Sequence, residues 1–214
     1  MDGIDCEGVL PAPTKSDNRM AQRFALMLRA AKLIADDREF LCILRDASSR
    51  GVRVRLFHDL PPHRELALEL GNGERLQIEK IWRDGDHAGF RFACETDVQR
   101  LIDDNTAAHP KRQLRLRIGL AALVHSGGTA TPMTFHDISQ QGACIDCIRH
   151  LALNELIRIE APALPPIYAK VRWRRQPLYG LVFEHPFKLD ELARMAAPLQ
   201  TMPMQDEAHI RRPA

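Results

Sequence analysis

An internal repeat does more than any other feature to limit how this chain can fold. Trp82 and Trp173 are the only tryptophans in the 214 residues, and they lie 91 positions apart. The same offset relates five further pairs: Asp46 and Asp137, Ser48 and Ser139, Gly51 and Gly142, Gly89 and Gly180, and Phe92 and Phe183. The repeat therefore predicts two homologous domains of about ninety residues, each large enough for one small core.

Composition predicts where these domains begin and end. Residues 1–18 contain Gly, Pro and acidic residues without any period, which predicts a flexible lead. The polar stretch 103–110 predicts a linker between a first domain, residues 19–102, and a second domain, residues 111–198. Residues 199–214 are then expected to form a loose C-terminal tail.

Each half is predicted to be mainly β. Residues 51–57 alternate apolar and polar side chains, and further short strands between turns follow in both halves, which favours an antiparallel barrel or sandwich. Apolar residues at helical spacing predict a closing helix in each half, at 97–102 and 189–196. Residues 24–35 have the composition of a helix. Their place in the repeat matches that of 116–124, and we expect both segments to be first strands.

Charge and composition exclude several classes of protein. Lys and Arg number 30 against 28 Asp and Glu, so any anion site must be a local cluster of cations, and bulk binding of nucleic acid is not expected. No run of 18 apolar residues occurs, so no membrane insertion is expected. The acidic N-terminus and the odd count of 5 cysteines predict a soluble protein of a reducing, cytoplasmic compartment.

Two side-chain clusters in the first half could hold an anionic ligand. Arg19 and Arg23 precede the first strand, and their guanidinium groups match phosphate oxygens and guanine acceptors. In the segment Asp46-x-Ser48-x-x-Gly51, the carboxylate can accept from a guanine edge, and glycine permits close approach. Taken singly, the arginine cluster could equally be a pair of solvated surface arginines, and the Asp-Ser-Gly segment could equally be an Asx turn between two strands. The pairing of the two clusters is what suggests ligand binding.

These residues carry a resemblance to a known family. Arg19-x-x-x-Arg23, Asp46-x-Ser48-x-x-Gly51 and the later Trp82 resemble a PilZ domain, the bacterial module that binds cyclic di-GMP. The second half resembles one too, through the following residues: Arg115, Asp137, Ser139, Gly142, Trp173 and Gly180. The resemblance implies two tandem six-stranded antiparallel barrels, each with a C-terminal helix. It also implies that the arginines grip phosphates and guanines while Asp and Ser hold guanine edges.

The two halves differ in their arginines. Lys111 takes the position of Arg19 in the second half, within Lys111-Arg112-Gln113-Leu114-Arg115, and lysine cannot make the bidentate contact of a guanidinium. We therefore expect the first domain to hold the main ligand site. A second, weaker site would use Lys111, Arg112, Arg115, Asp137, Ser139 and Gly142. The second domain could otherwise dock a partner or form a homodimer.

No motif predicts catalysis. Cys144-x-x-Cys147 falls on a predicted strand, where residues three apart point to opposite faces, so buried thiols are favoured over a metal or redox site. The nine histidines show no ligand spacing, and no metal or cofactor is expected. Ser48 and Ser139 lack a convincing adjacent base.

The sequence thus predicts a non-catalytic cyclic di-GMP receptor that relays the signal through its domain arrangement to a downstream protein. The alternative is a tandem barrel adaptor that acts by protein–protein contact without the ligand. An oligonucleotide-binding barrel ranks last, because only 6% of the residues are aromatic and few stacking platforms are available.

Overall fold

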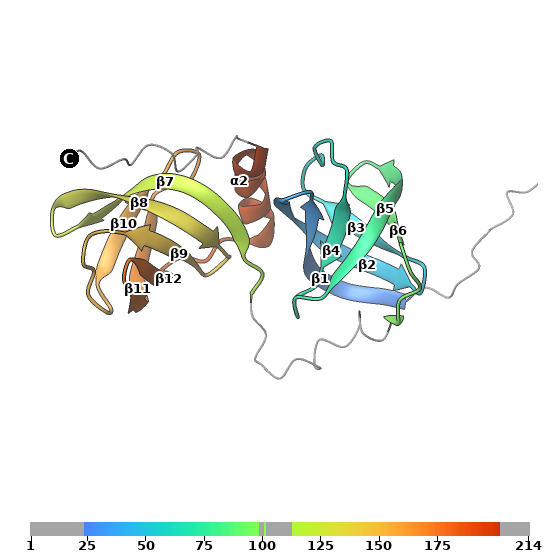
Figure 1. Cartoon of the computed structure of the whole chain (residues 1–214), viewed down its shortest axis with the longest axis horizontal. Helices are drawn as coiled ribbons and strands as arrows, with labels where there is room; N and C mark the ends of the chain where they lie inside the picture. Colours follow the sequence, from blue (N-terminus) through green and yellow to red (C-terminus); the bar gives the residue numbers. More distant parts are fainter. Residues whose placement is uncertain (1–23, 99–100, 102–112, 202–214) are drawn as a thin grey trace, which may run out of the picture.

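Two closed barrels lie side by side, with one helix between them (Figure 1). The computed structural model describes residues 24–98, 101 and 113–201. The first barrel contains the strands β1 (Phe24–Ala35), β2 (Arg38–Ser48), β3 (Gly51–Leu56), β4 (Leu66–Glu69), β5 (Arg75–Asp84) and β6 (His87–Phe92). Its strands follow the order β1-β2-β3-β6-β5-β4, and β4 pairs with β1 to close it.

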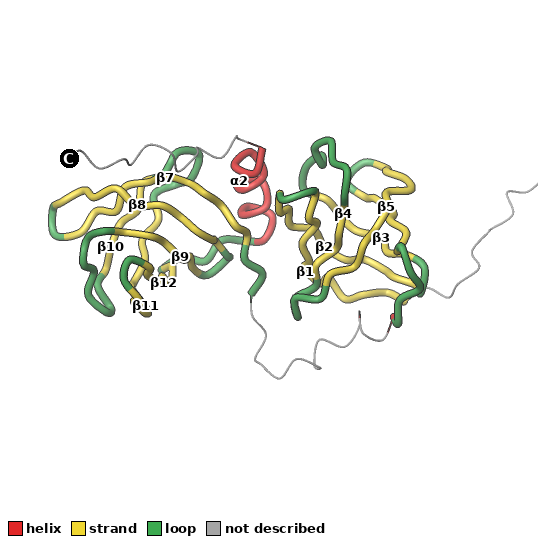
Figure 2. The backbone as a smooth tube through the Cα atoms, in the orientation of Figure 1, coloured by secondary structure: helices red, strands yellow, loops and turns green. Residues whose placement is uncertain are grey.

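The second barrel has the same order of strands. It contains β7 (Leu116–Ser126), β8 (Thr129–Ile138), β9 (Gly142–Cys147), β10 (Leu156–Glu160), β11 (Ile167–Arg175) and β12 (Leu178–Phe183). Every described pairing is antiparallel, and β10 pairs with β7 to close the barrel. The prediction of two tandem six-stranded antiparallel barrels is therefore confirmed, and the described backbone is mostly strand (Figure 2).

The segment with a helical composition is a strand, as expected. Its side chains Ala31, Leu33 and Ala35 alternate into the barrel core and are fully buried. Lys32 points to the other face and is also buried. Pairing with both β2 and β4 outweighs the weak helical propensity of Ala and Leu, because tertiary burial contributes more than propensity.

Bulges recur at equivalent places in the two barrels. The pairing register shifts just before Asp46 in β2 and just before Asp137 in β8. It shifts again just before Trp82 in β5 and just before Trp173 in β11. A bulge turns the following side chain away from regular alternation. The repeated landmarks of the sequence therefore lie where each barrel wall bends.

The helix between the barrels contacts both of them. Helix α2 (Leu189–Thr201) buries Leu192, Ala193 and Ala196 against the second barrel, and Ala197 packs against the core of the first. It continues beyond the predicted end at residue 196, so residues 199–201 are helical and do not belong to a loose tail. The physical reason is that Leu199 packs against the second core.

The corresponding helix of the first barrel is described only in part. Val98 and Leu101 are helical, and Leu101 is fully buried in the first core. Residues 99, 100 and 102 of the predicted helix 97–102 lie outside the described residues. Among the helices that the structure does describe, none is long and apolar enough to cross a membrane.

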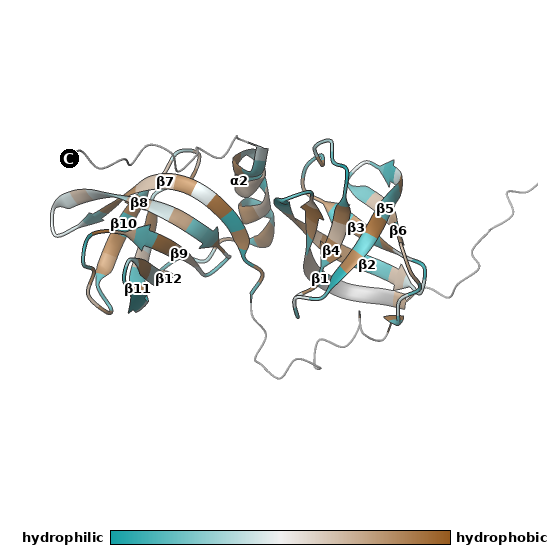
Figure 3. Cartoon of the chain, in the orientation of Figure 1, coloured by the Kyte–Doolittle hydropathy of each residue, from teal (hydrophilic) through white to brown (hydrophobic). Residues whose placement is uncertain are grey.

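Each barrel has its own hydrophobic core. Hydrophobic and hydrophilic residues are interspersed along the strands of both barrels (Figure 3). Phe40 and Leu44 lie in the first core, and Phe135 and Tyr179 in the second. Leu41 is an exception, since it belongs to the first barrel but packs with the second core. The outer face of β2 is therefore part of the contact between the barrels.

A glycine beneath each tryptophan holds the bulged strand against its neighbour. The indole of Trp82 lies against Gly89, and that of Trp173 against Gly180. A Cβ atom at either glycine would overlap the indole ring. Neither position tolerates a side chain unless the tryptophan moves.

We expect Gly89→Ala to lower the free energy of unfolding by about 1–3 kcal/mol, the usual cost of overpacking. Urea denaturation measures this change. The cost should be much smaller in a Trp82→Leu background, because leucine leaves room for the new methyl group. An equal cost in both backgrounds would show that the indole is not the cause.

Candidate functional site

A cleft of about 780 Å³ lies between the barrels and is lined by both. The second barrel contributes Arg115, Asp137, Ser139 and Gly142, four residues that the sequence analysis singled out. The first barrel contributes β1, β4 and the turn after β4. A cleft of this size is typical of small-molecule sites, which span about 300–1,000 Å³.

The bulge in β8 sets the position of the acidic group in this cleft. The Asp137 carboxylate accepts a hydrogen bond from the backbone N–H of Cys144, at 3.2 Å. It also pairs with Arg115, whose Nη1 lies 2.5 Å from Oδ1. A carboxylate and a guanidinium are therefore held next to each other at the cleft wall.

Ser139 and Gly142 shape the turn between β8 and β9. The Ser139 hydroxyl donates to the carbonyl oxygen of Gly142 at 3.0 Å, and the Ser139 N–H donates to the same oxygen at 2.8 Å. A Cβ atom on Gly142 would overlap the carbonyl oxygen of Leu181. The motif is therefore a tight turn that also forms part of the cleft wall, and its serine is almost fully buried.

The sequence analysis missed several residues of this cleft. Arg172, the bulge residue of β11, and the first-barrel residues Lys32 and Glu69 all line it. One signal was available for Lys32, namely a charge inside the otherwise apolar segment 30–35. Arg172 carried no comparable signal, because it occupies the repeat position of Ile81.

Comparison with known families identifies the barrel that supplies most of the cleft. Residues 110–197 match the model of the PilZ domain. The second barrel is a PilZ domain. The match covers the cleft residues of this barrel, and the first barrel repeats the strand order of the PilZ domain without being part of that match.

Three solved structures are similar to the chain at low identity. The first is the PlzA protein of Borreliella burgdorferi in complex with c-di-GMP, at 11% identity over 78% of this chain and 86% of that chain, with a TM-score of 0.33. The second is the MrkH–c-di-GMP complex of K. pneumonia, at 13% identity over 80% of this chain and 85% of that chain, with a TM-score of 0.32. The third is the inhibitor of motility MotI/DgrA of Bacillus subtilis, at 12% identity over 80% of this chain and 95% of that chain, with a TM-score of 0.32. At these TM-scores the likeness carries no argument about this chain. No curated protein sequence matches it.

The equivalent face of the first barrel is arranged differently from that of the PilZ domain. Asp46 lies across the sheet from Arg53, and their side chains form an ion pair at 2.5 Å. In the PilZ domain the cross-strand partner of Asp137 is Cys144 instead. An arginine from within the barrel therefore meets the first aspartate, whereas Arg115 meets the second.

The remaining predicted residues of the first half are only partly described. Ser48 Oγ donates to the carbonyl oxygen of Gly51 at 3.4 Å, a longer version of the turn in the PilZ domain. Arg19 and Arg23 lie outside the described residues, as do Lys111 and Arg112. The expected main site in the first domain therefore stays a prediction.

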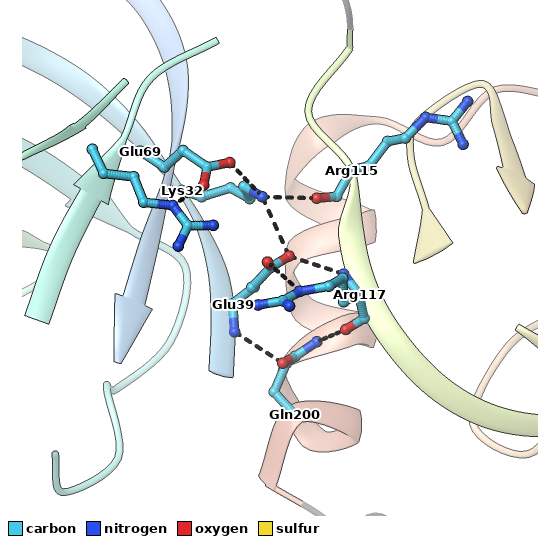
Figure 4. A network of polar contacts seen from close by, with 7 residues as sticks. Lys32, Glu39, Glu69, Arg115, Arg117 and Gln200 are labelled. Atoms are coloured by element: carbon cyan, nitrogen blue, oxygen red, sulfur yellow. Dashed lines mark hydrogen bonds and ion pairs between the residues drawn. The ribbon is translucent and has the colours of Figure 1, made fainter. Parts of the chain in front are cut away.

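A network of polar contacts joins the barrels beside the cleft (Figure 4). Lys32 Nζ lies 2.6 Å from Glu69 and 3.3 Å from Glu39, and it donates to the backbone carbonyl oxygen of Arg115 at 3.1 Å. Glu39 accepts from the backbone N–H and from Nε of Arg117, both at 2.9 Å. These contacts fix the start of the PilZ domain against the first barrel.

Gln200 of helix α2 completes the network. Its side-chain oxygen accepts from the backbone N–H of Glu39 at 2.9 Å, and its amide nitrogen donates to the carbonyl oxygen of Arg117 at 2.6 Å (Figure 4). The amide thus bridges a strand of each barrel.

Burial and charge shift the pKa values of two groups in the cleft. Burial by itself raises the pKa of Glu69, but hydrogen bonds from Lys32 and Arg75 outweigh it and hold this pKa below its usual value. Glu69 is therefore ionised at neutral pH, and the stability that it contributes is lost as the pH falls through its lowered pKa. Burial, followed by the charge of Asp137, raises the pKa of the Cys144 thiol.

The cysteines of the predicted strand are buried thiols, as expected. Cys144 faces the cleft, and Cys147 belongs to the core of the PilZ domain. Burial also raises the pKa of Cys147. Within the described part of the chain, no group of three or more His, Cys, Asp or Glu side chains could hold a metal ion.

We expect Cys144 and Cys147 to react with iodoacetamide about tenfold or more slowly than the exposed Cys94, because a raised pKa and burial reduce the accessible thiolate. Peptide mass spectrometry of the native protein at pH 8 measures the three rates. In denaturant the rates should converge. Alkylation of native Cys144 as fast as that of Cys94 would contradict this description of the cleft.

Proposed function

We propose that this protein is a non-catalytic receptor of cyclic di-GMP and that the ligand binds in the cleft between the barrels, on the PilZ domain. One observation carries the proposal. Arg115, Asp137, Ser139 and Gly142, which carry the family resemblance in the second half, all line one large cleft. These four residues lie within the segment that matches the PilZ family.

The chemistry of the cleft suits a cyclic dinucleotide. Arg115 and Arg172 offer guanidinium groups to phosphate oxygens or guanine acceptors. The Asp137 carboxylate can accept from the N–H groups of a guanine edge. Trp173, which is 41% exposed, offers an aromatic surface against which a base can stack.

The described geometry favours the PilZ domain over the first barrel as the main site. Arg53 pairs with Asp46 across the first barrel, and Ile81 stands where the PilZ domain has Arg172. On this face the first barrel therefore presents an apolar side chain where the PilZ domain presents an arginine, and its carboxylate is paired from the neighbouring strand. A main site on the PilZ domain differs from the sequence-based expectation that the first domain is the principal binder. Titration of variants at each location distinguishes the two.

A receptor fits the cleft better than an enzyme does. No histidine lines the cleft among the described residues, and the raised pKa of Cys144 disfavours a nucleophilic thiolate. The proposal keeps the expected cytoplasmic location and a downstream protein as the recipient of the signal. The PilZ domain, the first barrel and α2 would present the surface that this recipient reads.

We expect Arg172→Ala to weaken cyclic di-GMP binding about tenfold or more, because one charged hydrogen-bond donor to the ligand is lost. Isothermal titration measures the dissociation constant. The control is Arg175→Ala, which removes an exposed arginine from the same strand outside the cleft and should leave binding unchanged. Equal effects of the two substitutions would indicate general electrostatic attraction instead of a site.

The same titration of an Arg19→Ala/Arg23→Ala variant separates the two locations. Binding that survives this double substitution but is lost in Arg115→Ala supports the cleft on the PilZ domain. The reverse pattern would place the main site in the first domain. No binding by the unaltered protein would overturn the receptor proposal and favour the ligand-independent adaptor.

A further inference from the structure

Lys32 is an unusual residue in the wall of the cleft. It belongs to the first barrel, it is only 6% exposed, and it reaches a backbone carbonyl oxygen of the PilZ domain. It lies directly across the sheet from Glu69 in the pairing of β1 with β4. Because buried lysines require partners, the contacts of this ammonium group indicate what it does.

All three donors of the Lys32 ammonium group have acceptors. They are met by Glu69 at 2.6 Å, the Arg115 carbonyl oxygen at 3.1 Å and Glu39 at 3.3 Å. An ammonium group has three N–H donors, so none remains for a ligand in the cleft. Its charge is moreover matched by two carboxylates. Lys32 therefore lines the cleft without being suited to grip an anion there.

The contact with Arg115 gives Lys32 a different role. The Arg115 guanidinium pairs with Asp137 in the cleft, while its backbone carbonyl oxygen is held by Lys32. Arg117 lies two residues after Arg115, and Glu39 of the first barrel accepts hydrogen bonds from both its backbone N–H and its side chain. Figure 4 shows the result: the Arg117 side chain points toward Glu39, and that of Arg115 points away from the network.

From these contacts we infer that Lys32 is a positioning residue. It fixes the backbone of Arg115, and so it sets the anion affinity of the PilZ domain without donating to the ligand itself. This inference rests on the proposed function where it concerns affinity. The part that concerns the position of Arg115 can be tested without any ligand.

The substitutions must avoid leaving a buried carboxylate unpaired. Lys32→Met alone would leave Glu69 and Glu39 facing each other, and such a variant could fail to fold. The informative comparison is therefore Glu69→Gln against Lys32→Met/Glu69→Gln, which differ only at residue 32. Glu39 keeps Arg117 as a partner in both. Lys80→Met is the matched control, since Lys80 is an exposed lysine of the same barrel outside the cleft.

The ligand-free measurement follows the Arg115 side chain by NMR. We expect its Nε–H signal to shift, and the backbone N–H of Arg117 to exchange faster with solvent, in Lys32→Met/Glu69→Gln but not in Glu69→Gln or Lys80→Met. Identical Arg115 signals in the paired variants would overturn the inference. This result stands whether or not cyclic di-GMP is the ligand.

Titration with cyclic di-GMP gives the second measurement. We expect the dissociation constant of Lys32→Met/Glu69→Gln to exceed that of Glu69→Gln about tenfold. This is the effect of losing one charge-assisted contact between Arg115 and the ligand. Equal constants for the pair would show that Lys32 does not set the affinity. If the unaltered protein fails to bind, the proposed function is wrong, and the NMR comparison alone decides whether Lys32 positions Arg115.

Discussion

The buried charges between the barrels are the constraint on which the arrangement of this molecule depends. Lys32 and Glu39 are almost completely buried where β1 and β2 of the first barrel meet β7 of the second. Removing such groups from water is costly, and the cost is offset only when every charge finds close partners. Those partners come from both barrels and from α2, so only a narrow range of relative positions satisfies the network. The cleft beside it is therefore a built feature of the interface.

The two barrels show how one fold can carry two different surfaces. Both have bulges before the aspartate and before the tryptophan, so their walls bend at the same places. The difference comes from the residue opposite the aspartate. Arg53 pairs with Asp46 from the neighbouring strand of the first barrel, whereas Cys144 lies opposite Asp137, which pairs with Arg115 at the cleft wall. A single cross-strand substitution thus adds, beside the first aspartate, a cation that the second one lacks on the opposite strand.

Much of the fold could be predicted from local pattern. The 91-residue offset predicted two related domains, and alternation predicted their strands, because inward and outward side chains alternate along every barrel wall. The predicted end of α2 was wrong because Leu199 and Gln200 are held in the helix by contacts with distant residues. The candidate site was predicted in part. Asp137, Ser139 and Gly142 were found from their spacing, whereas Lys32, Glu69 and Arg172 were not.

The sequence by itself determined the number of domains, their strand pattern and the turn motif that each domain repeats, since these depend on residues close together in the chain. Only the tertiary structure decided that the first barrel supplies a wall of the second barrel's cleft. Lys32 and Arg115 are 83 residues apart, and nothing in their local sequence relates them. Their contact depends on how two finished barrels pack, which is set by buried charge and shape across the interface.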